Sequence, residues 1–345
     1  MVDMIKNLKD VDNLIISPER KLFSAEHEEI VNGATTDIYF VKTQEILKAR
    51  DLAETVITAE IFSRGEGIMA GTTEAMGLLS SCTAQVWALP EGQAFTSKEV
   101  VMRITGKYSD FGIYETALLG ILASSCGWAT AAAQVKKAAG DNKVLCFGAR
   151  HVHPAVAPVM ERAAIIGGAD GASCILGAKL AGIEPSGTVP HAIFLIMGDT
   201  VEVAKAYNEI MPPDAPRTVL VDTFKDEAEE SLRVAEALGP ALQGIRLDTP
   251  SERGGVTPGL VREVRARLDQ AGYEHVRIFV SGGLDPSKLT LLKDAGADSF
   301  GVGSYISGAP AIDMTMDIKE VSGQPIAKRG RIPGITATER LVRMQ

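Results

Sequence analysis

Two glycine-rich stretches, FVSGGLDPSKL and FGVGSYISG, each begin in a run of β-forming residues. They place Ser281, Gly282 and Gly283 after one predicted strand, and Gly301 and Gly303 after the next. Glycine allows a backbone to approach a ligand closely, and successive backbone N–H groups can bind an anion. Either stretch alone is typical of an ordinary strand-to-helix turn. Together they favour a phosphate-binding site.

Carboxylates follow two other β-rich runs. GIRLD ends in Asp248, which Thr249 follows, and TVLVD ends in Asp222. Such carboxylates could hold a magnesium ion, ribose hydroxyls or a developing positive charge. The alternative is that they cap the helices that follow, because Asp and Thr are common N-cap residues. Arg246, which lies in the first of these runs, is assigned to the substrate-binding group.

Basic side chains occupy two further positions. The stretch CFGARHVHP places Arg150 and His151 after a β-rich run, where they could bind a carboxylate or a pyrophosphate. The alternative for Arg150 is an internal salt bridge. His191 follows Pro190 and a predicted strand around GTVP. A lone histidine is more often structural than catalytic, but the convergence of these groups favours a phosphorylated, anionic small substrate.

The second half of the chain must position these groups. From about residue 141, short β-rich runs alternate with helical stretches, a pattern typical of a parallel α/β sheet. The runs are KVLCF, a short one near Asp170, GTVP, RTVLVD, GIRLD, VRIFVSGG and DSFGVGS. About seven strands suit an irregular, incomplete α/β barrel better than a finished eightfold barrel. Catalytic groups are then expected where the strands end.

The first part of the chain has a different pattern. AQVWALPEGQAFTSKEVVMRITG alternates around a Pro-Glu-Gly turn, as a hairpin does. The tail, MTMDIKEVSGQPIAKRGR, returns to strand, turn and strand. We therefore expect an N-terminal α+β cap domain over residues 1–115, joined by the tail 310–345, and a barrel over residues 116–309.

Composition excludes several classes of protein. The chain has 345 residues, 46% of them hydrophobic, and a formal net charge of −9, which argues against a nucleic-acid or anionic-membrane partner. Residues 116–134 carry no charge, but Ser, Thr and Gln interrupt them, so a buried helix is expected rather than a membrane span. The N-terminus shows no export signal, which favours the cytoplasm. The four cysteines are scattered singly, so no zinc is expected and no metal-ligating residue is assigned.

The order of several motifs resembles the compact type II phosphoribosyltransferases, in particular the nicotinate phosphoribosyltransferases. The matching stretches are TTDIYFVKTQEIL, LPEGQAF, YSDFGIYETALLGIL, FGARHVHP, GGADGASCILGAKLAGIEPSGTVPHA, IRLDTPSERGG, VSGGLD and FGVGSYIS. The resemblance implies transfer of phosphoribose from phosphoribosyl pyrophosphate to nicotinate, which gives nicotinate mononucleotide and pyrophosphate. It also implies Mg²⁺ with the pyrophosphate, an irregular barrel with a cap, and head-to-tail dimers that share active sites. Coupling to ATP is left open.

The resemblance also implies roles for single residues. Tyr39 matches an aromatic residue that stacks on the pyridine ring and comes from the partner subunit. Arg150 matches a basic position near the nicotinate carboxylate and pyrophosphate, and His191 matches a histidine beside the pyrophosphate. Asp248 matches an acidic residue near the ribose. The five Ser and Gly residues of the two glycine-rich stretches match the 5′-phosphate cradle.

Four alternatives remain at this point. One is a phosphate-binding barrel aldolase or isomerase, which would share the two glycine-rich loops but would usually place a Schiff-base lysine or a catalytic acid or base at a strand end, where no lysine is obvious. Quinolinate phosphoribosyltransferase would need several converging basic residues for two ring carboxylates, whereas Arg150 is the main basic group at the predicted strand ends. A nicotinamide-specific enzyme would need no partner for a carboxylate. A non-catalytic barrel that binds a phosphorylated metabolite is the alternative outside the enzymes.

Overall fold

The computed structural model describes residues 4–345, and the chain forms two compact units. One comprises the residues up to Thr130 together with Pro310–Gln345, and the other is Ala131–Ala309. The division falls inside the long helix α6 (Glu115–Ala139), later than the boundary expected at residue 115. The expected α/β architecture is confirmed, because an antiparallel sheet with helices forms the first unit and a parallel sheet with helices forms the second.

The first unit contains a six-stranded sheet in the order β13-β12-β1-β5-β3-β14. Its strands are β1 (Val56–Ser63), β3 (Gln85–Ala88), β5 (Val100–Lys107), β12 (Met314–Val321), β13 (Gln324–Pro325) and β14 (Val342–Arg343). Antiparallel pairing joins β3 to β5 around the predicted Pro-Glu-Gly turn. The short strand β4 (Ala94–Phe95) pairs instead with β2 (Gly67–Ile68) in a separate two-stranded sheet.

Helices cover this sheet and complete its core. They are α1 (Leu8–Asp12), α2 (His27–Val31), α3 (Ile38–Ala49), α4 (Thr72–Leu79), α5 (Tyr108–Phe111), the 3₁₀ turn η1 (Gly112–Tyr114) and the first part of α6. Fully buried side chains from β1, β5 and α6 meet in one apolar cluster that includes Ile61, Met102, Ile104, Leu118 and Leu122. Burial of this apolar surface is the main stabilising term for the unit.

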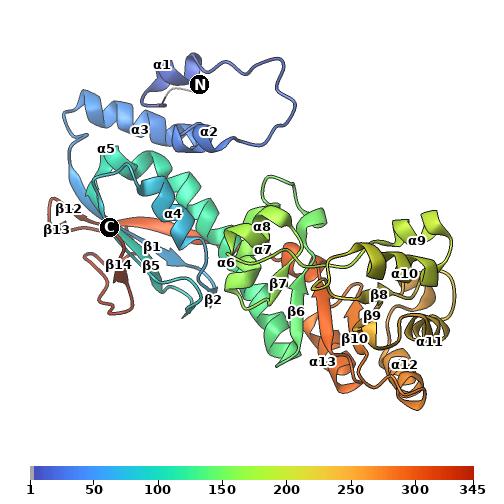
Figure 1. Ribbon diagram of the computed structural model, residues 1–345. Coiled ribbons are helices and arrows are strands. Elements are labelled where there is room, and N and C mark those ends of the chain that lie inside the picture. Colours follow the sequence, from blue (N-terminus) through green and yellow to red (C-terminus); the bar gives the residue numbers. More distant parts are fainter. Residues whose placement is uncertain (1–3) are drawn as a thin grey trace. The chain divides into compact units, whose positions relative to one another are not determined.

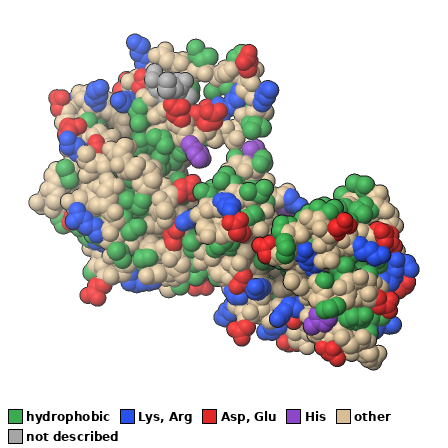
Figure 2. Space-filling view, viewed as in Figure 1, with side chains coloured by type: hydrophobic (Ala, Val, Ile, Leu, Met, Phe, Trp, Pro, Cys, Tyr) green, Lys and Arg blue, Asp and Glu red, His purple; other side chains and the backbone are tan. Residues whose placement is uncertain are grey.

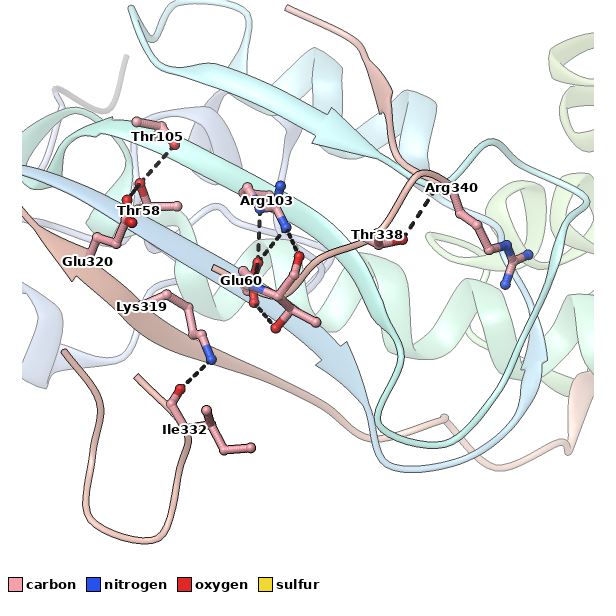
Figure 3. A network of polar contacts seen from close by, with 10 residues as sticks. Thr58, Glu60, Arg103, Thr105, Lys319, Glu320, Ile332, Thr338 and Arg340 are labelled. Atoms are coloured by element: carbon pink, nitrogen blue, oxygen red, sulfur yellow. Dashed lines mark hydrogen bonds and ion pairs between the residues drawn. The ribbon is translucent and has the colours of Figure 1, made fainter. Parts of the chain in front are cut away.

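The C-terminal tail returns to this unit, as the sequence predicted. β12 pairs with β1, and β14 pairs with β3. Between these strands the tail crosses a buried ion pair in which Arg103 contacts Glu60 at 2.7 Å, and the Glu60 side chain is 1% exposed. Thr336 closes this network, because its backbone N–H and hydroxyl both donate to Glu60, at 3.0 and 2.7 Å. Figure 3 shows the Arg103 side chain directed at Glu60. The charge of Glu60 is thereby satisfied inside the sheet.

The second unit contains a six-stranded sheet in the order β7-β6-β11-β10-β9-β8, and every pairing in it is parallel. The strands are β6 (Lys143–Cys146), β7 (Gly171–Ala172), β8 (Thr218–Leu220), β9 (Gly244–Leu247), β10 (Arg277–Ser281) and β11 (Ser299–Val302). The last strand, β11, pairs with the first, β6, so the sheet curls back on itself. Only β7 and β8 are left as edges, which makes an incomplete barrel.

Helices connect consecutive strands of this barrel (Figure 1). They are α7 (Ala157–Ile166), α8 (Ile175–Leu180), α9 (His191–Met197), α10 (Thr200–Ile210), α11 (Glu227–Leu238), α12 (Pro258–Gln270) and α13 (Pro286–Asp294), with 3₁₀ turns η2 (Ala149–His151), η3 (Gly239–Ala241) and η4 (Ser251–Arg253). The short helix α14 (Ser304–Ser307) follows the last barrel strand, β11. Asp226, Thr257 and Asp285 cap α11, α12 and α13 through side-chain hydrogen bonds. These caps fix where each strand-to-helix loop ends.

The prediction of a strand around GTVP is wrong. The described residues contain six barrel strands, and residues 184–190 form an extended connection between the two edge strands. Pro185 and Pro190 bracket this segment and cannot donate ladder hydrogen bonds. One bond, from Ser186 N–H to the carbonyl of Ala172, ties it to β7. His191 therefore opens the helix α9 instead of ending a strand.

One helical segment of the described chain, Tyr108–Ala139, is long and apolar enough to cross a membrane by length and composition alone. Half of its most apolar window is buried inside the protein, and a core helix passes the same test. On the visible face of the molecule, acidic and basic side chains are interspersed (Figure 2).

Candidate functional site

A pocket of about 370 Å³ lies at the carboxyl ends of β6, β9, β10 and β11. Its lining comes from the last residues of these strands, the loops after them, the loop after β7 and the connection before α9: Phe147, Ala149, Arg150, His151, Ser173, Gly187, Thr188, Arg246, Asp248, Ser281, Gly282, Gly283, Gly301, Gly303 and Ser304. Most of the residues singled out in the sequence thus meet in one cavity. This is the end of a parallel barrel where ligands are generally bound.

Arg246 organises the floor of this pocket. Its Nε donates to the hydroxyl of Ser281 at 2.8 Å, one terminal nitrogen donates to Thr188 Oγ1 at 2.8 Å, and the other contacts Asp248 Oδ2 at 3.2 Å. Ser281 in turn donates to Asp248 Oδ1 at 2.8 Å. Both oxygens of Asp248 are therefore held in place, which a planar guanidinium with donors in several directions makes possible.

Two aromatic rings flank this guanidinium. The Cζ atom of Arg246 lies 5.2 Å from the ring centre of Phe147 and 5.8 Å from that of Phe279. The two rings meet edge to face, with their centres 5.8 Å apart. Burial lowers the pKa of Arg246, whereas the nearby Asp248 and Asp222 carboxylates act in the opposite direction. The guanidinium is thus a rigid, partly desolvated cation.

His191 and Asp222 form a second pair on the same side of the barrel. His191 Nε2 lies 3.1 Å from Asp222 Oδ2. The Asp222 side chain is fully buried, and its other oxygen, Oδ1, has no hydrogen-bond partner among the described residues. Burial raises the pKa of Asp222, although the hydrogen bond from His191 opposes this shift. An unsatisfied buried carboxylate oxygen needs an explanation, and a cation or a ligand hydroxyl would provide one.

Arg150 lies on η2 and makes no ion pair within the described chain. Its Nε approaches His151 Nε2 at 3.5 Å, and His151 Nδ1 lies 3.2 Å from Ser307 Oγ. The alternative of an internal salt bridge for Arg150 is therefore wrong for the chain by itself. A guanidinium without an internal carboxylate at the edge of a pocket is suited to bind an external anion.

The glycine residues have two different structural roles. Gly282 and Gly283 adopt positive φ angles of 95° and 61°, which favour glycine. At Gly301 a Cβ atom would lie 2.6 Å from the Phe147 ring, and at Gly303 it would lie 2.7 Å from His151. The second glycine pair is thus required by packing of the pocket wall, and the first by the shape of the turn.

The helix-capping alternative for Asp222 and Asp248 is wrong, because the following helices α11 and α12 are capped by Asp226 and Thr257. Thr249, in contrast, lies outside the pocket lining. It is 5% exposed, and its hydroxyl donates to the buried Glu227 at 2.8 Å. Its side chain therefore holds the loop after β9 instead of facing the pocket.

Tyr39 belongs to the first unit, where it lies on α3 with 55% of its surface exposed. It lines a separate pocket of about 290 Å³ with Asp37 and Glu115. Burial raises the pKa of Glu115 to about 7, and the nearby Asp317 carboxylate adds to the shift.

Six pocket residues are not among the predicted site residues: Phe147, Ala149, Ser173, Gly187, Thr188 and Ser304. Phe147 precedes the predicted Arg150 by three positions, so the rule that functional groups follow strand ends could have included it. Thr188 was hidden by the wrong assignment of its segment to a strand. Among the described residues, no group of three or more His, Cys, Asp or Glu side chains is arranged to hold a metal ion.

Comparison with known proteins identifies the family. The profile of the quinolinate phosphoribosyl transferase N-terminal domain matches residues 37–126, and that of the C-terminal domain matches residues 128–317. The chain therefore belongs to the quinolinate phosphoribosyl transferase family, the type II phosphoribosyltransferases.

Curated relatives carry the name nicotinate phosphoribosyltransferase. One from Mycobacterium tuberculosis is 32% identical over 250 residues, which is 69% of this chain and 54% of the relative. A second from the same organism is 30% identical over 318 residues, 86% of this chain and 67% of the relative. The chain thus spans about half the length of the first of these relatives.

Solved structures agree on the fold. The nicotinate-nucleotide pyrophosphorylase from Pyrococcus furiosus is 44% identical, with a TM-score of 0.87 over 92% of this chain and 82% of that one. Human nicotinic acid phosphoribosyltransferase is 19% identical, with a TM-score of 0.68 over 86% of this chain and 76% of that one, and it supports the fold alone.

Proposed function

We propose that the protein is a nicotinate phosphoribosyltransferase, which joins nicotinate to phosphoribosyl pyrophosphate and releases pyrophosphate. The observation that carries this proposal is the pocket itself. It combines two glycine-rich turns, a guanidinium without an internal anion at Arg150, and a fixed carboxylate at Asp248. A substrate with phosphate groups, a ribose and one carboxylate has the complementary chemistry.

The ribose centre would be stabilised by Asp248. Departure of pyrophosphate leaves positive charge on the ribose, and a carboxylate held by Arg246 and Ser281 is suited to face that charge without reorganisation. No covalent intermediate with the protein is required. The turn at Gly282 and Gly283 would receive the 5′-phosphate through backbone N–H groups.

The leaving pyrophosphate would be bound by Arg150 and His191. The hydrogen bond to Asp222 fixes the orientation of the His191 imidazole, and a third group that orients a histidine in this way is common at catalytic sites. Of the pocket-lining arginines, Arg246 is already engaged with Asp248, which leaves Arg150 for external anions. One such guanidinium favours a base with one carboxylate over quinolinate with two.

The unpaired Oδ1 of Asp222 and the carboxylate of Asp248 fit a divalent cation by chemistry, since Mg²⁺ prefers carboxylate oxygens and keeps several waters. Mg²⁺ bound with the pyrophosphate would neutralise charge on the leaving group. We further propose a cytoplasmic homodimer or higher oligomer in which Tyr39 of one subunit stacks on the base in the site of another. Coupling to ATP is part of the test below.

Quinolinate is the second candidate substrate, because both matched profiles carry the quinolinate phosphoribosyl transferase description. The test is pyrophosphate release from phosphoribosyl pyrophosphate and Mg²⁺ with nicotinate, quinolinate or nicotinamide, each with and without ATP. We expect turnover with nicotinate. Turnover with quinolinate alone would replace the proposed reaction by the decarboxylating one. No turnover with any of the three bases would contradict both reactions.

A further inference from the structure

Glu161 is a buried carboxylate directly behind the pocket wall. It lies on α7, and none of its surface is exposed. The proposed reaction assigns no role to Glu161. A charged side chain without access to water is costly unless its oxygens are fully hydrogen bonded, so its environment shows what it does.

Three donors from two different loops meet at this carboxylate. Oε1 accepts from the backbone N–H of Ala149 at 3.2 Å and from the hydroxyl of Ser173 at 3.0 Å. Oε2 accepts from the backbone N–H of Cys174 at 2.6 Å. Ala149 lies in the loop after β6, and the other two residues lie in the loop after β7. Glu161 therefore joins the two loops that form one side of the pocket.

No cation shares this position, because Glu161 makes no ion pair within residues 4–345. Its negative charge is balanced by N–H and O–H dipoles alone, and bonds to a charged acceptor are stronger than neutral ones. The loop after β6, and the helix α8 that continues the loop after β7, also approach α7 closely. A Cβ atom on Gly148 would lie 2.7 Å from Met160 Cε, and one on Gly177 would lie 3.1 Å from the Glu161 Cβ. The loops therefore have little room to shift.

We propose that Glu161 is a positioning residue for anion binding: it fixes Ala149, and with it the neighbouring Arg150, against Ser173 on the facing loop. Arg150 and Ser173 both line the pocket, whereas Glu161 does not. Glu161 thus acts through Arg150 and does not touch the substrate. The identity of the anion as pyrophosphate rests on the proposed function.

The substitution Glu161→Gln tests this role with little change in shape. A carboxylate accepts at both oxygens, whereas an amide presents one oxygen and one NH₂ donor. If the NH₂ group replaces Oε2, it faces the N–H of Cys174. If it replaces Oε1, it faces the N–H of Ala149. Either orientation sets two donors against each other, so one loop must move.

The experiment is titration calorimetry of inorganic pyrophosphate with Mg²⁺ into four full-length proteins: the wild type, Glu161→Gln, Arg150→Ala and the double variant. We expect Glu161→Gln to weaken pyrophosphate binding about tenfold, as the loss of one charge-assisted hydrogen bond would. In the Arg150→Ala background the same substitution should change the affinity less than about twofold, because the two residues act in series.

Glu230→Gln is the matched control. Glu230 is also fully buried, in the same unit, but pairs with Arg233 on α11 and lies outside the pocket lining. It should alter the unfolding midpoint without altering pyrophosphate affinity. If Glu161→Gln fails to fold, Ser173→Ala removes one of the three donors and should weaken binding in the same direction by about twofold to fivefold.

The outcomes separate this inference from the proposed function. Unchanged affinity in a folded Glu161→Gln protein, or an equal loss with and without Arg150, would overturn the positioning role. The proposed function alone would be overturned if the wild type binds pyrophosphate and the four proteins give the expected affinities, but the wild type turns over none of the three bases. Failure of the wild type to bind pyrophosphate would overturn both.

Discussion

Replacing His191 by alanine should destabilise the barrel unit, and the cost should depend on Asp222. Among the described residues, the imidazole is the one side-chain hydrogen-bond partner of Asp222, at 3.1 Å, and the second carboxylate oxygen has no partner. After the substitution a fully buried carboxylate has no side-chain partner among the described residues. His191→Ala should also lower kcat, because the group proposed to face the pyrophosphate is gone.

The magnitude follows from this geometry. A buried acceptor left without its partner costs about 1–3 kcal/mol. Because 40% of the His191 side chain is exposed, water can partly replace it, and the lower part of that range, about 1–2 kcal/mol, applies. For a unit of this size the unfolding midpoint should fall by about 3–6 °C.

A double-mutant cycle identifies the cause. In the Asp222→Asn background there is no buried charge at position 222, so His191→Ala should lower the midpoint by less than half as much. His191→Gln keeps an N–H donor, so its unfolding midpoint should return most of the way to that of the wild type, whereas its kcat should stay low. The assay is thermal unfolding of these variants in one buffer. Equal drops with Asp and with Asn at position 222 would refute the reasoning.

Three further predictions concern other parts of the molecule. Arg246→Lys keeps the charge, but a lysine cannot contact Ser281, Thr188 and Asp248 together, so kcat/KM should fall by about 10- to 100-fold. Steady-state kinetics would measure this change, with folding checked by circular dichroism. A change below twofold would contradict the hydrogen-bond network assigned to Arg246. Gly303→Ala should destabilise the protein more than Gly283→Ala. A Cβ atom at Gly303 would lie 2.7 Å from His151, whereas at Gly283 the space is open and the cost comes only from the positive φ angle. Chemical denaturation that ranks the two variants in the reverse order would be inconsistent with this packing. Glu115 has its pKa raised to about 7 in the folded protein, so the folded state binds the proton more tightly than the unfolded chain and stability falls as pH rises from about 4.5 to about 7. Glu115→Gln should remove this dependence and be more stable than the wild type above about pH 7, by about 1 kcal/mol after allowance for solvent screening of a partly exposed group; parallel pH profiles of the two proteins would speak against the shift.

Much of the barrel could be predicted from the sequence, because each buried parallel strand is a short apolar run followed by a polar or glycine-rich loop. β10 is the clearest case: four of its five residues are buried, and Gly282 and Gly283 follow in the expected turn. The same rule places Arg150 and Asp248 after strand ends, and both line the pocket. The return of the C-terminal tail was also predicted, from the renewed alternation in β12.

The segment around Thr188 shows where such reasoning fails. Its apolar residues suggest a strand, but two prolines remove the donors that a central strand needs. The segment is held instead by side-chain contacts, Thr188 with Arg246 and His191 with Asp222, which join residues far apart in sequence. Local patterns do not report contacts of this kind, and the same holds for Glu161, whose donors come from two loops.

The preference of the protein for one pyridine base is tested most directly by competition between the three candidate bases. The wild-type protein would be given phosphoribosyl pyrophosphate, Mg²⁺ and an equimolar mixture of nicotinate, quinolinate and nicotinamide, each with a different isotopic label in its ring. The mononucleotides would be quantified by mass spectrometry. The ratio of products gives the ratio of kcat/KM values. We predict that nicotinate mononucleotide carrying the nicotinate label exceeds each of the other products at least tenfold. Nicotinate mononucleotide that carries mainly the quinolinate label would contradict the account.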